Sequence, residues 1–530
     1  MSLYPVMVFS ALNKLIRSPL LWIALLVAWV ALTRGQDHNW DLLNYHAYNP
    51  FAWLHGRHAI DLMPAQMQSW YNPTLDLPFY WLATAPIDGR WVALWLALPA
   101  VFAVWVGLRL ATRLAARPLR LVEQVLLVLV MLSGGAGFAS LATTFNEWPI
   151  ALGLISCLYL LMRGIETSTV RWWPLLLAGL IGGAAVGLKL TAMVYALALG
   201  IGCLCFAPTG ARLRATAGFG LAGLLGALLA GGVWFFHVYT ITGNPVFPYF
   251  NDLFNSPFAE PWRYQDDRFK PQGLLETFRH LGLLARGATV FGELRVRDPR
   301  LLLGLLGFVI MAIAWLRGRL RWERLADRQL ILLWSIFVVG LIGWLWLHAI
   351  YRYTIFLELL VAVGGIALIT RVDRAWLRWL LLGLVFLAAA YTQRPDWGRQ
   401  DYSKPFLRNT YPDLPADSVI VTLSWEPLGY AVVGLPKDVP VFAVSSNFIR
   451  PDRCLPWHRD ALEKLGQAQV IWLLQAAQQP TEQELQDADR YGLQITDQCR
   501  SLRSTLGDKQ ICRMQVQSPD RLSCKAKVGE

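Results

Sequence analysis

The sequence predicts a polytopic α-helical membrane protein that ends in an α/β domain outside the membrane. The chain has 530 residues, of which 55% are hydrophobic, and it contains 25 tryptophans. Its mean hydropathy is +0.40. Apolar runs close to the roughly 20 residues that a membrane-spanning helix needs recur along the first three quarters of the chain. The composition then becomes that of an aqueous domain, so we predict a transmembrane module at 1–392 and a soluble domain at 393–530.

The transmembrane module is predicted to contain about eleven spanning helices. Arginines concentrate in alternate short loops, and the positive-inside rule then places the N-terminus, with Lys14 and Arg17, in the cytoplasm and the C-terminal domain outside. Two long polar stretches, 34–81 and 237–300, are predicted to be outer loops. The predicted spans are 19–33, 91–108, 121–141, 148–162, 173–187, 191–206, 216–236, 301–316, 329–347, 354–369 and 379–391.

The formal net charge of +12 is also explained by the basic residues of the loops between spans. In a soluble protein such a charge would suggest a nucleic-acid partner. Here the basic residues lie mainly in short loops between apolar spans, where they orient the chain in the bilayer. We therefore expect the membrane bilayer as a partner and no nucleic acid.

The C-terminal region is predicted to alternate strands with helices. Short β-like runs occur at 418–422, 439–443 and 470–474, and a helical stretch covers 482–491. This alternation favours a small α/β domain. Four cysteines lie in the same region, Cys454, Cys499, Cys512 and Cys524. An even number of cysteines is typical of disulfides in an oxidising compartment, but spacing leaves all three pairings open.

The loop 34–81 collects an unusual share of the groups that can do chemistry. It contains four of the eight histidines and four aspartates: His38, His46, His55, His58, Asp37, Asp41, Asp61 and Asp76. A helix is predicted from Asp41 to Gly56, since glycine commonly ends helices. Helical spacing then puts Asp41, Tyr45, Tyr48 and Ala52 on one face. Asp41 either presents a carboxylate near the membrane surface or caps this helix.

Further charged groups lie at predicted outer helix ends. Glu147 is in a short loop between two spans, and Lys189 is isolated in an apolar setting, where a cation is costly and usually functional. Lys189 would otherwise snorkel to the interface. Arg352 either pairs with Glu358 or holds an anion. Asp41 and Glu147 supply two carboxylates on this membrane face, and it also carries two cations, Lys189 and Arg352. This combination suggests an anionic lipid substrate. The cations would hold its phosphate, and a carboxylate would act as general base.

Several ordered sequence pieces together resemble the GT-C glycosyltransferases, which are integral-membrane enzymes that use polyprenyl-phosphate sugars. Members include protein O-mannosyltransferases and lipid A aminoarabinose transferases. The resembling pieces are Asp41 with Tyr45 and Gly56, Leu77-Pro78-Phe79-Tyr80-Trp81, Gly89-Arg90-Trp91, Asn146-Glu147, Gly187-Leu188-Lys189-Leu190-Thr191 and Arg352-Tyr353. Leu42 follows Asp41, whereas many members have Asp-Glu there.

The resemblance implies an inverting glycosyltransferase of a bacterial inner membrane. It would move a sugar from a polyprenyl-phosphate donor to a lipid, glycan or protein acceptor on the periplasmic face, where the C-terminal domain also lies. Asp41 would be the catalytic base and Glu147 a supporting acid. The substrate-binding residues would be Tyr45, His46, Lys189, His348, Tyr351, Arg352 and Tyr353.

No cofactor and no metal site is assigned from the sequence. A divalent metal is left open, because a metal-dependent subset of the GT-C enzymes uses paired acids; His38, Asp41 and His46 would then be the ligands. Two other functions also stay open. One is a transporter or flippase of a lipid-linked sugar, although internal repeats and broken midplane helices, common in transporters, are not evident. The other is a non-catalytic protein of envelope-glycan assembly.

Overall fold

The computed structural model describes residues 18–451 and 453–524, so the predicted cytoplasmic Lys14 and Arg17 lie outside the described residues. Contacts divide the chain into two units, each built from three separate segments. We call them the helical unit (Met1–Arg34, Leu96–Gly232 and Asp266–Trp397) and the mixed unit (Gly35–Trp95, Val233–Gln265 and Gly398–Glu530). The predicted boundary at 392/393 separates membrane from water, which contacts do not test, and it stays a prediction.

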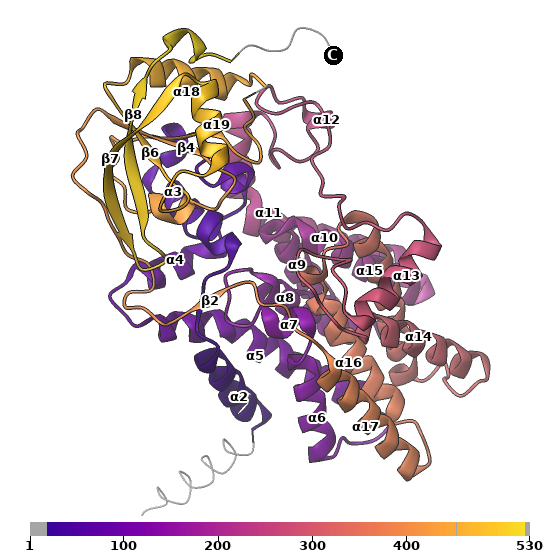
Figure 1. Cartoon of the computed structure of the whole chain (residues 1–530). Helices are drawn as coiled ribbons and strands as arrows, with labels where there is room; N and C mark the ends of the chain where they lie inside the picture. Colours follow the sequence, from indigo (N-terminus) through magenta and orange to yellow (C-terminus); the bar gives the residue numbers. More distant parts are fainter. Residues whose placement is uncertain (1–17, 452, 525–530) are drawn as a thin grey trace, which may run out of the picture. The chain divides into compact units, whose positions relative to one another are not determined.

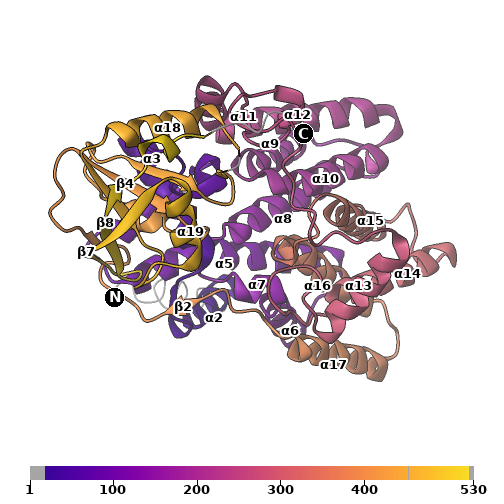
Figure 2. The same cartoon turned by 45° about the horizontal axis from the view of Figure 1, so that its top comes forward.

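The helical unit consists of packed apolar helices. Within it α8 packs against α9, and α10 packs against α15 (Figure 2). Its helices are α2 (Pro19–Thr33), α6 (Leu121–Leu132), α7 (Gly135–Ala139), α8 (Glu147–Gly164), α9 (Trp172–Leu188), α10 (Met193–Phe206), α13 (Leu274–Arg286), α14 (Arg300–Leu316), α15 (Leu325–Leu347), α16 (Ile355–Ile369) and α17 (Ala375–Tyr391). Helices α5 (Gly89–Leu114) and α11 (Arg212–Thr242) are divided between the two units.

Four helical stretches of the described chain are long and apolar enough to cross a membrane: Gly89–Leu114, Thr209–Thr242, Leu325–Leu347 and Tyr351–Ile369. Shorter apolar helices accompany them, and every predicted span except the end of 121–141 falls on a described helix. The chain is therefore mostly helical and has the character of a multi-pass membrane protein. The count of about eleven spans and the sidedness of the termini stay predictions.

The predicted span 121–141 is wrong in its last third, because α6 ends at Leu132 and the short helix α7 begins at Gly135. The Glu358 carboxylate causes this break. It accepts hydrogen bonds from the backbone N–H groups of Ala136 and Gly137, at 2.9 and 3.0 Å. A Cβ atom on Gly134 would lie 1.9 Å from a Glu358 oxygen, so a larger residue there would displace the carboxylate.

The glycines of α9 serve helix packing. A Cβ atom on Gly183 would lie 1.7 Å from the carbonyl oxygen of Gly223, and one on Gly187 would lie 2.4 Å from that of Ala227. Close backbone approach through small residues is the usual way in which membrane helices associate. The Gly-rich stretch before Lys189 therefore brings α9 against α11.

The C-terminal part of the mixed unit forms a six-stranded sheet with order β3-β7-β8-β6-β4-β5. The pairs β4–β5 and β4–β6 are parallel, and the other neighbours are antiparallel (yellow and orange in Figure 1). The elements are β3 (Asn409–Thr410), β4 (Ser418–Leu423), β5 (Val441–Ser445), α18 (Pro456–Gln467), β6 (Val470–Leu474), α19 (Glu482–Arg490), β7 (Leu493–Ser504) and β8 (Lys509–Val516). The predicted α/β domain is confirmed, although the β7–β8 hairpin and α18 were not predicted.

The polar loop 34–81 packs largely on this domain, inside the same unit. Leu62 extends the sheet: its N–H donates to Val441 and its carbonyl accepts from Ala443, both at 2.9 Å. Arg57 is fully buried, pairs with Asp61 at 2.6 Å and donates to the carbonyl of Val439. The loop contains a π-helical segment Leu42–His46, α3 (Tyr48–His55) and α4 (Asp76–Thr84), and β1 (Gln36–Asp37) pairs with β2 (Arg399–Gln400).

Two disulfides resolve the pairing that the sequence left open. Cys454 bonds to Cys524, and Cys499 bonds to Cys512. The second pair joins directly opposed positions of β7 and β8. The first joins the segment before α18 to the end of the described chain. The prediction of two disulfides among these four cysteines is confirmed.

Candidate functional site

Glu147 lies in the first turn of α8, where the helix dipole favours a carboxylate. It is 5% exposed. The loop before it is strained, because Ala142 and Asn146 adopt left-handed backbone conformations with φ of 54° and 64°. Such conformations cost free energy for residues other than glycine and often occur at functional sites. The loop thus fixes the position of a buried carboxylate at the start of helix α8.

Lys189 follows α9 in an extended conformation, and its side chain bends toward Glu147. Its ammonium group forms a short ion pair with the Glu147 carboxylate and donates to the carbonyl of Phe145 at 2.7 Å. The side chain is 20% exposed. Lys189 therefore does not snorkel away from the protein, and the ion pair meets the cost of placing a cation among apolar helices.

Arg352 brings a second cation to the same carboxylate. Its Nε lies 3.9 Å from Glu147 Oε1, and its guanidinium lies over the Phe145 ring at 4.9 Å. Tyr353 contributes a ring 5.3 Å from the Lys189 ammonium. The structure therefore brings together Glu147, Lys189, Arg352 and Tyr353, which the sequence predicted as site residues. Two cations therefore lie against one carboxylate in this cluster.

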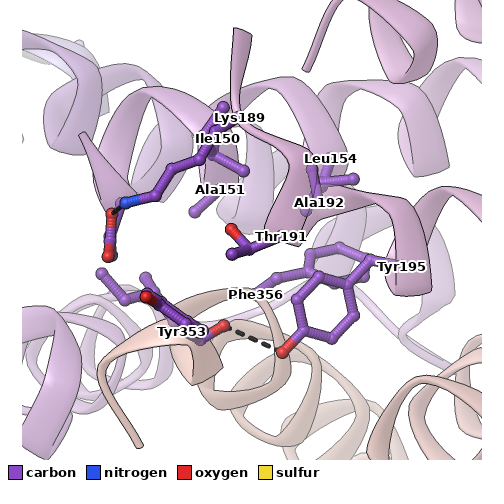
Figure 3. Close-up of a pocket in the computed structure, with 11 residues that line it drawn as sticks. Ile150, Ala151, Leu154, Lys189, Thr191, Ala192, Tyr195, Tyr353 and Phe356 are labelled. Carbon is purple, nitrogen blue, oxygen red and sulfur yellow. Dashed lines mark hydrogen bonds and ion pairs between the residues drawn. The ribbon is translucent and has the colours of Figure 1, made fainter. Parts of the chain in front are cut away.

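A pocket opens beside this cluster (Figure 3). Its polar lining comes from Glu147, Lys189, Thr191, Tyr195 and Tyr353, and the remaining wall is apolar. The Tyr195 hydroxyl donates to the backbone carbonyl of Tyr353 at 2.8 Å, which fixes the short helical turn that carries Arg352. Tyr195 was missed by sequence analysis; its only signal was a tyrosine one helical turn beyond Thr191 in an apolar span.

Tyr351 and Glu358 belong to a neighbouring buried network. The Tyr351 hydroxyl lies 2.8 Å from carboxylate oxygens of both Asp298 and Glu358. Asp298 forms a short ion pair with Arg300. The suggested pairing of Arg352 with Glu358 is therefore wrong, because α7 backbone groups and Tyr351 occupy that carboxylate. The network anchors the turn that carries Arg352 and Tyr353, and the predicted role of Tyr351 in substrate binding stays a prediction.

His348 lies at the end of α15, with its ring 5.7 Å from the Tyr353 ring. Its Nε2 atom is buried without a hydrogen-bond partner. Burial, together with the positive charges of Lys270 and Lys189, lowers the pKa of His348 to about 4. The imidazole is therefore neutral near pH 7. A neutral histidine can accept or donate a hydrogen bond without adding to the positive charge of the cluster.

Asp41 lies in the mixed unit, at the start of the π-helical segment, and is 6% exposed. The Tyr45 hydroxyl donates to its carboxylate at 2.9 Å, as the predicted helical spacing requires. The predicted helix from Asp41 to Gly56 is continuous only in part, because the π-helical segment ends before α3 begins. Beyond this segment, the Tyr48 hydroxyl donates to the Asp61 carboxylate at 3.0 Å. Gly56 ends the helix with φ of 67°, as predicted.

His46, next to Tyr45, forms a buried pair with Asp76. The two side chains meet at 2.9 Å, through His46 Nδ1 and a carboxylate oxygen at the start of α4. His46 Nε2 is buried without a hydrogen-bond partner. The Asp76 carboxylate holds the His46 ring in one orientation, and Nε2 is the ring nitrogen that this pairing does not use. Asp76 was noticed in the sequence only as one of four loop aspartates.

The residues suspected as metal ligands have other partners. His38 Nε2 hydrogen-bonds the carbonyl of Leu506 at 2.9 Å, and His46 pairs with Asp76. Across 18–451 and 453–524, no group of three His, Cys, Asp or Glu side chains is arranged to hold a metal ion. The sequence-based option of a divalent metal stays untested.

The comparisons with known proteins support the fold. No protein-family model matches the chain, and no curated protein sequence matches it closely. The apo crystal structure of ArnT from Cupriavidus metallidurans matches 98% of this chain and 100% of its own, with 12% identity and a TM-score of 0.51. ArnT bound to undecaprenyl phosphate matches 70% of this chain and 63% of its own, with 17% identity and a TM-score of 0.45.

An archaeal oligosaccharyltransferase in the apo form, from Archaeoglobus fulgidus, matches 81% of this chain and 65% of its own, with 12% identity and a TM-score of 0.39. The chain thus spans slightly less than two thirds of this protein and of the lipid-bound ArnT chain. The fold comparison rests on apo ArnT. The chain has the GT-C fold, as its sequence resemblance predicted.

Proposed function

We propose that the protein is an inverting membrane glycosyltransferase that moves one sugar from a polyprenyl-phosphate donor to an acceptor outside the membrane. The observation that carries this proposal is the cluster of Lys189, Arg352 and Glu147 beside an apolar-walled pocket. Its two cations suit a phosphate whose negative charge grows as the sugar leaves. ArnT, whose apo form shares the fold, binds undecaprenyl phosphate, and this supports a lipid-linked donor.

In the proposed reaction Asp41 is the general base. The acceptor hydroxyl gives its proton to the Asp41 carboxylate while its oxygen forms a bond to the anomeric carbon. The bond from that carbon to the phosphate oxygen breaks, and its electron pair leaves with the lipid phosphate. Lys189 and Arg352 stabilise the departing phosphate. The hydrogen bond from Tyr45 orients the Asp41 carboxylate. These roles follow the sequence resemblance.

The proposal includes the predicted membrane arrangement. About eleven spans place the N-terminus in the cytoplasm and the C-terminal domain in the periplasm of a bacterial inner membrane. The two disulfides support an oxidising compartment for that domain. The acceptor is a lipid, glycan or protein on that side.

The test compares envelope glycans by mass spectrometry from cells that make the wild type or Asp41→Asn at equal membrane levels, with the native gene deleted. Asp88→Asn is the matched control, because Asp88 forms only a surface pair with Arg90. We expect one sugar mass to disappear from a defined glycan in Asp41→Asn alone. A full complement of glycans in that variant would refute the base assignment and favour the transporter or assembly function.

A further inference from the structure

A second pocket lies within the mixed unit, between the loop 34–81 and the C-terminal domain. One wall is the loop segment 58–63 together with Trp70. The opposite wall is one face of α18, which contributes Trp457, Asp460, Ala461 and Lys464. Spacings of three and four residues put these side chains on the same helix face. None of the residues assigned to transfer lines this pocket.

The pocket contains buried polar atoms without partners. The indole nitrogen of Trp70 is inaccessible to solvent and makes no hydrogen bond. The ring nitrogens of His58 are equally inaccessible, and their polar contact is a weak one with the Ser69 backbone. Burial is the main reason that the pKa of His58 falls to about 4; His237 acts in the same direction, and a weaker backbone hydrogen bond with Ser69 opposes the shift. A buried polar group without a partner is costly and rare, so these atoms indicate a ligand or bound water.

The rim of the pocket carries two opposite charges. Asp460 and Lys464 are exposed and lie one turn apart on α18. In the described part of the chain neither side chain forms an ion pair or a hydrogen bond. The pocket therefore offers a carboxylate acceptor, an ammonium donor, the indole N–H donor and a neutral imidazole that both donates and accepts.

This combination of donors and acceptors favours some ligand classes over others. A phosphate would suit the ammonium and indole groups, but the Asp460 carboxylate would repel it and the neutral His58 adds no positive charge. Hydroxyl groups donate and accept hydrogen bonds, so a polyhydroxylated ligand satisfies all four groups. Trp70 is stacked between His58 and Trp457, at centroid distances of 5.4 and 5.2 Å. These rings already stack on Trp70, so recognition relies on polar edges.

We propose that this pocket binds a saccharide through its hydroxyl groups. The saccharide would be part of the acceptor, so the acceptor of the proposed transfer would be a glycan. This inference rests on the proposed function. Asp460 and Lys464 would contact hydroxyls at the rim. The buried nitrogens of Trp70 and His58 would reach hydroxyls inside after these side chains shift toward the cavity. A site for the acceptor glycan would then be built from the C-terminal domain and the loop that contains Asp41.

The experiment is saturation-transfer NMR on the full chain in lipid nanodiscs. The probes are D-glucose, D-galactose, D-mannose and N-acetyl-D-glucosamine, each titrated into the millimolar range, with inorganic phosphate as the competing anion. At least one sugar is expected to bind the wild type. Asp460→Asn should weaken that binding about tenfold, since it weakens a charge-assisted hydrogen bond. Glu463→Gln, an exposed change on α18 outside the pocket, should leave binding unchanged.

Three outcomes would overturn the inference: no sugar binds, Asp460→Asn and Glu463→Gln bind alike, or inorganic phosphate displaces the sugar. Thermal melting of each variant separates loss of binding from loss of fold. The Asp41→Asn variant should bind the sugar as the wild type does. Sugar binding without any glycan transfer in cells would refute the proposed function alone. Transfer without sugar binding would refute this pocket alone.

Discussion

Lys189 forms an ion pair with Glu147, 42 residues away in the sequence, and thereby joins the end of α9 to the start of α8. Both residues come from short segments that the sequence singled out for their charge in an apolar setting. Arg352 approaches the same carboxylate from a third segment. Because membrane helices pay heavily for unpaired charge, this contact both holds the helix ends and keeps two cations near the pocket.

Lys189→Gln is expected to destabilise the protein and to weaken binding of undecaprenyl phosphate. The substitution leaves the Glu147 carboxylate buried without its closest cation, which costs about 3 kcal/mol of unfolding free energy. The double variant Glu147→Gln with Lys189→Gln should recover most of that stability, but not the lipid affinity. Thermal melting in detergent and a lipid-binding assay measure the two effects. Full lipid affinity in the double variant would contradict the phosphate role of Lys189.

Acidification is expected to destabilise the protein through His58. Its pKa in the folded protein is about 4, below the ordinary value of 6.5, so the unfolded chain binds the proton more readily. Stability contributed by the neutral imidazole is complete above pH 6.5 and is lost as the pH falls toward 4. The loss from this group is at most about 3 kcal/mol.

The measurement for His58 is the melting temperature at pH 7, 5.5 and 4.5. His58→Gln should flatten the pH dependence relative to the wild type, because glutamine does not titrate. His55→Gln is the matched control, since His55 is exposed at the end of α3. An equal pH dependence in the His58→Gln and wild-type proteins would contradict the prediction.

The disulfide between Cys454 and Cys524 is expected to contribute more stability than the one between Cys499 and Cys512. The two bonds close segments of 70 and 13 residues. A longer closed loop removes more conformational freedom from the unfolded chain, and each bond contributes about 2–4 kcal/mol in this view. Paired serine substitutions at each bond, followed by thermal melting, give the comparison. A larger loss for the Cys499 and Cys512 pair would show that the loop-closure argument fails here.

Gly183→Ala is expected to disrupt the packing of α9 on α11. Its new methyl group would overlap the Gly223 carbonyl oxygen, so the helices would have to separate. Gly220→Ala on α11 is the control, because a Cβ atom there meets nothing within 4 Å. We expect a loss of about 1–3 kcal/mol for the first change and little for the second, measured by melting in detergent. Equal stability of the two variants would refute the packing role of Gly183.

The sequence predicted the helices well because their apolar runs are long and their ends carry charge. The C-terminal strands β4, β5 and β6 were predicted to within two residues, since a buried strand of a parallel sheet is a short apolar run. The failures occurred where a distant residue decides the local structure. The break after Leu132 falls at Ser133-Gly134, inside the span predicted as continuous, and the Glu358 carboxylate that contacts it comes from a distant segment.

The contacts of the site residues also divide into those set by local spacing and those set by distant segments. Local spacing predicted the contact between Asp41 and Tyr45, because one helical turn separates them. The pairing of His46 with Asp76 and the contact of Tyr195 with the Tyr353 carbonyl depend on packing between separate segments. Most of the charged groups are evident in the sequence, but their partners are not.

The sequence by itself determined the apolar spans, the α/β character of the C-terminal domain, the presence of four cysteines that can pair and the charged residues at helix ends. These properties follow from periodicity and composition, which are evident within each segment of the sequence. Only the tertiary structure decided which cysteines bond, that Lys189 and Arg352 share the Glu147 carboxylate, and that the loop 34–81 packs on the C-terminal sheet. Such contacts depend on the distances between segments far apart in the chain, and no local pattern encodes those distances.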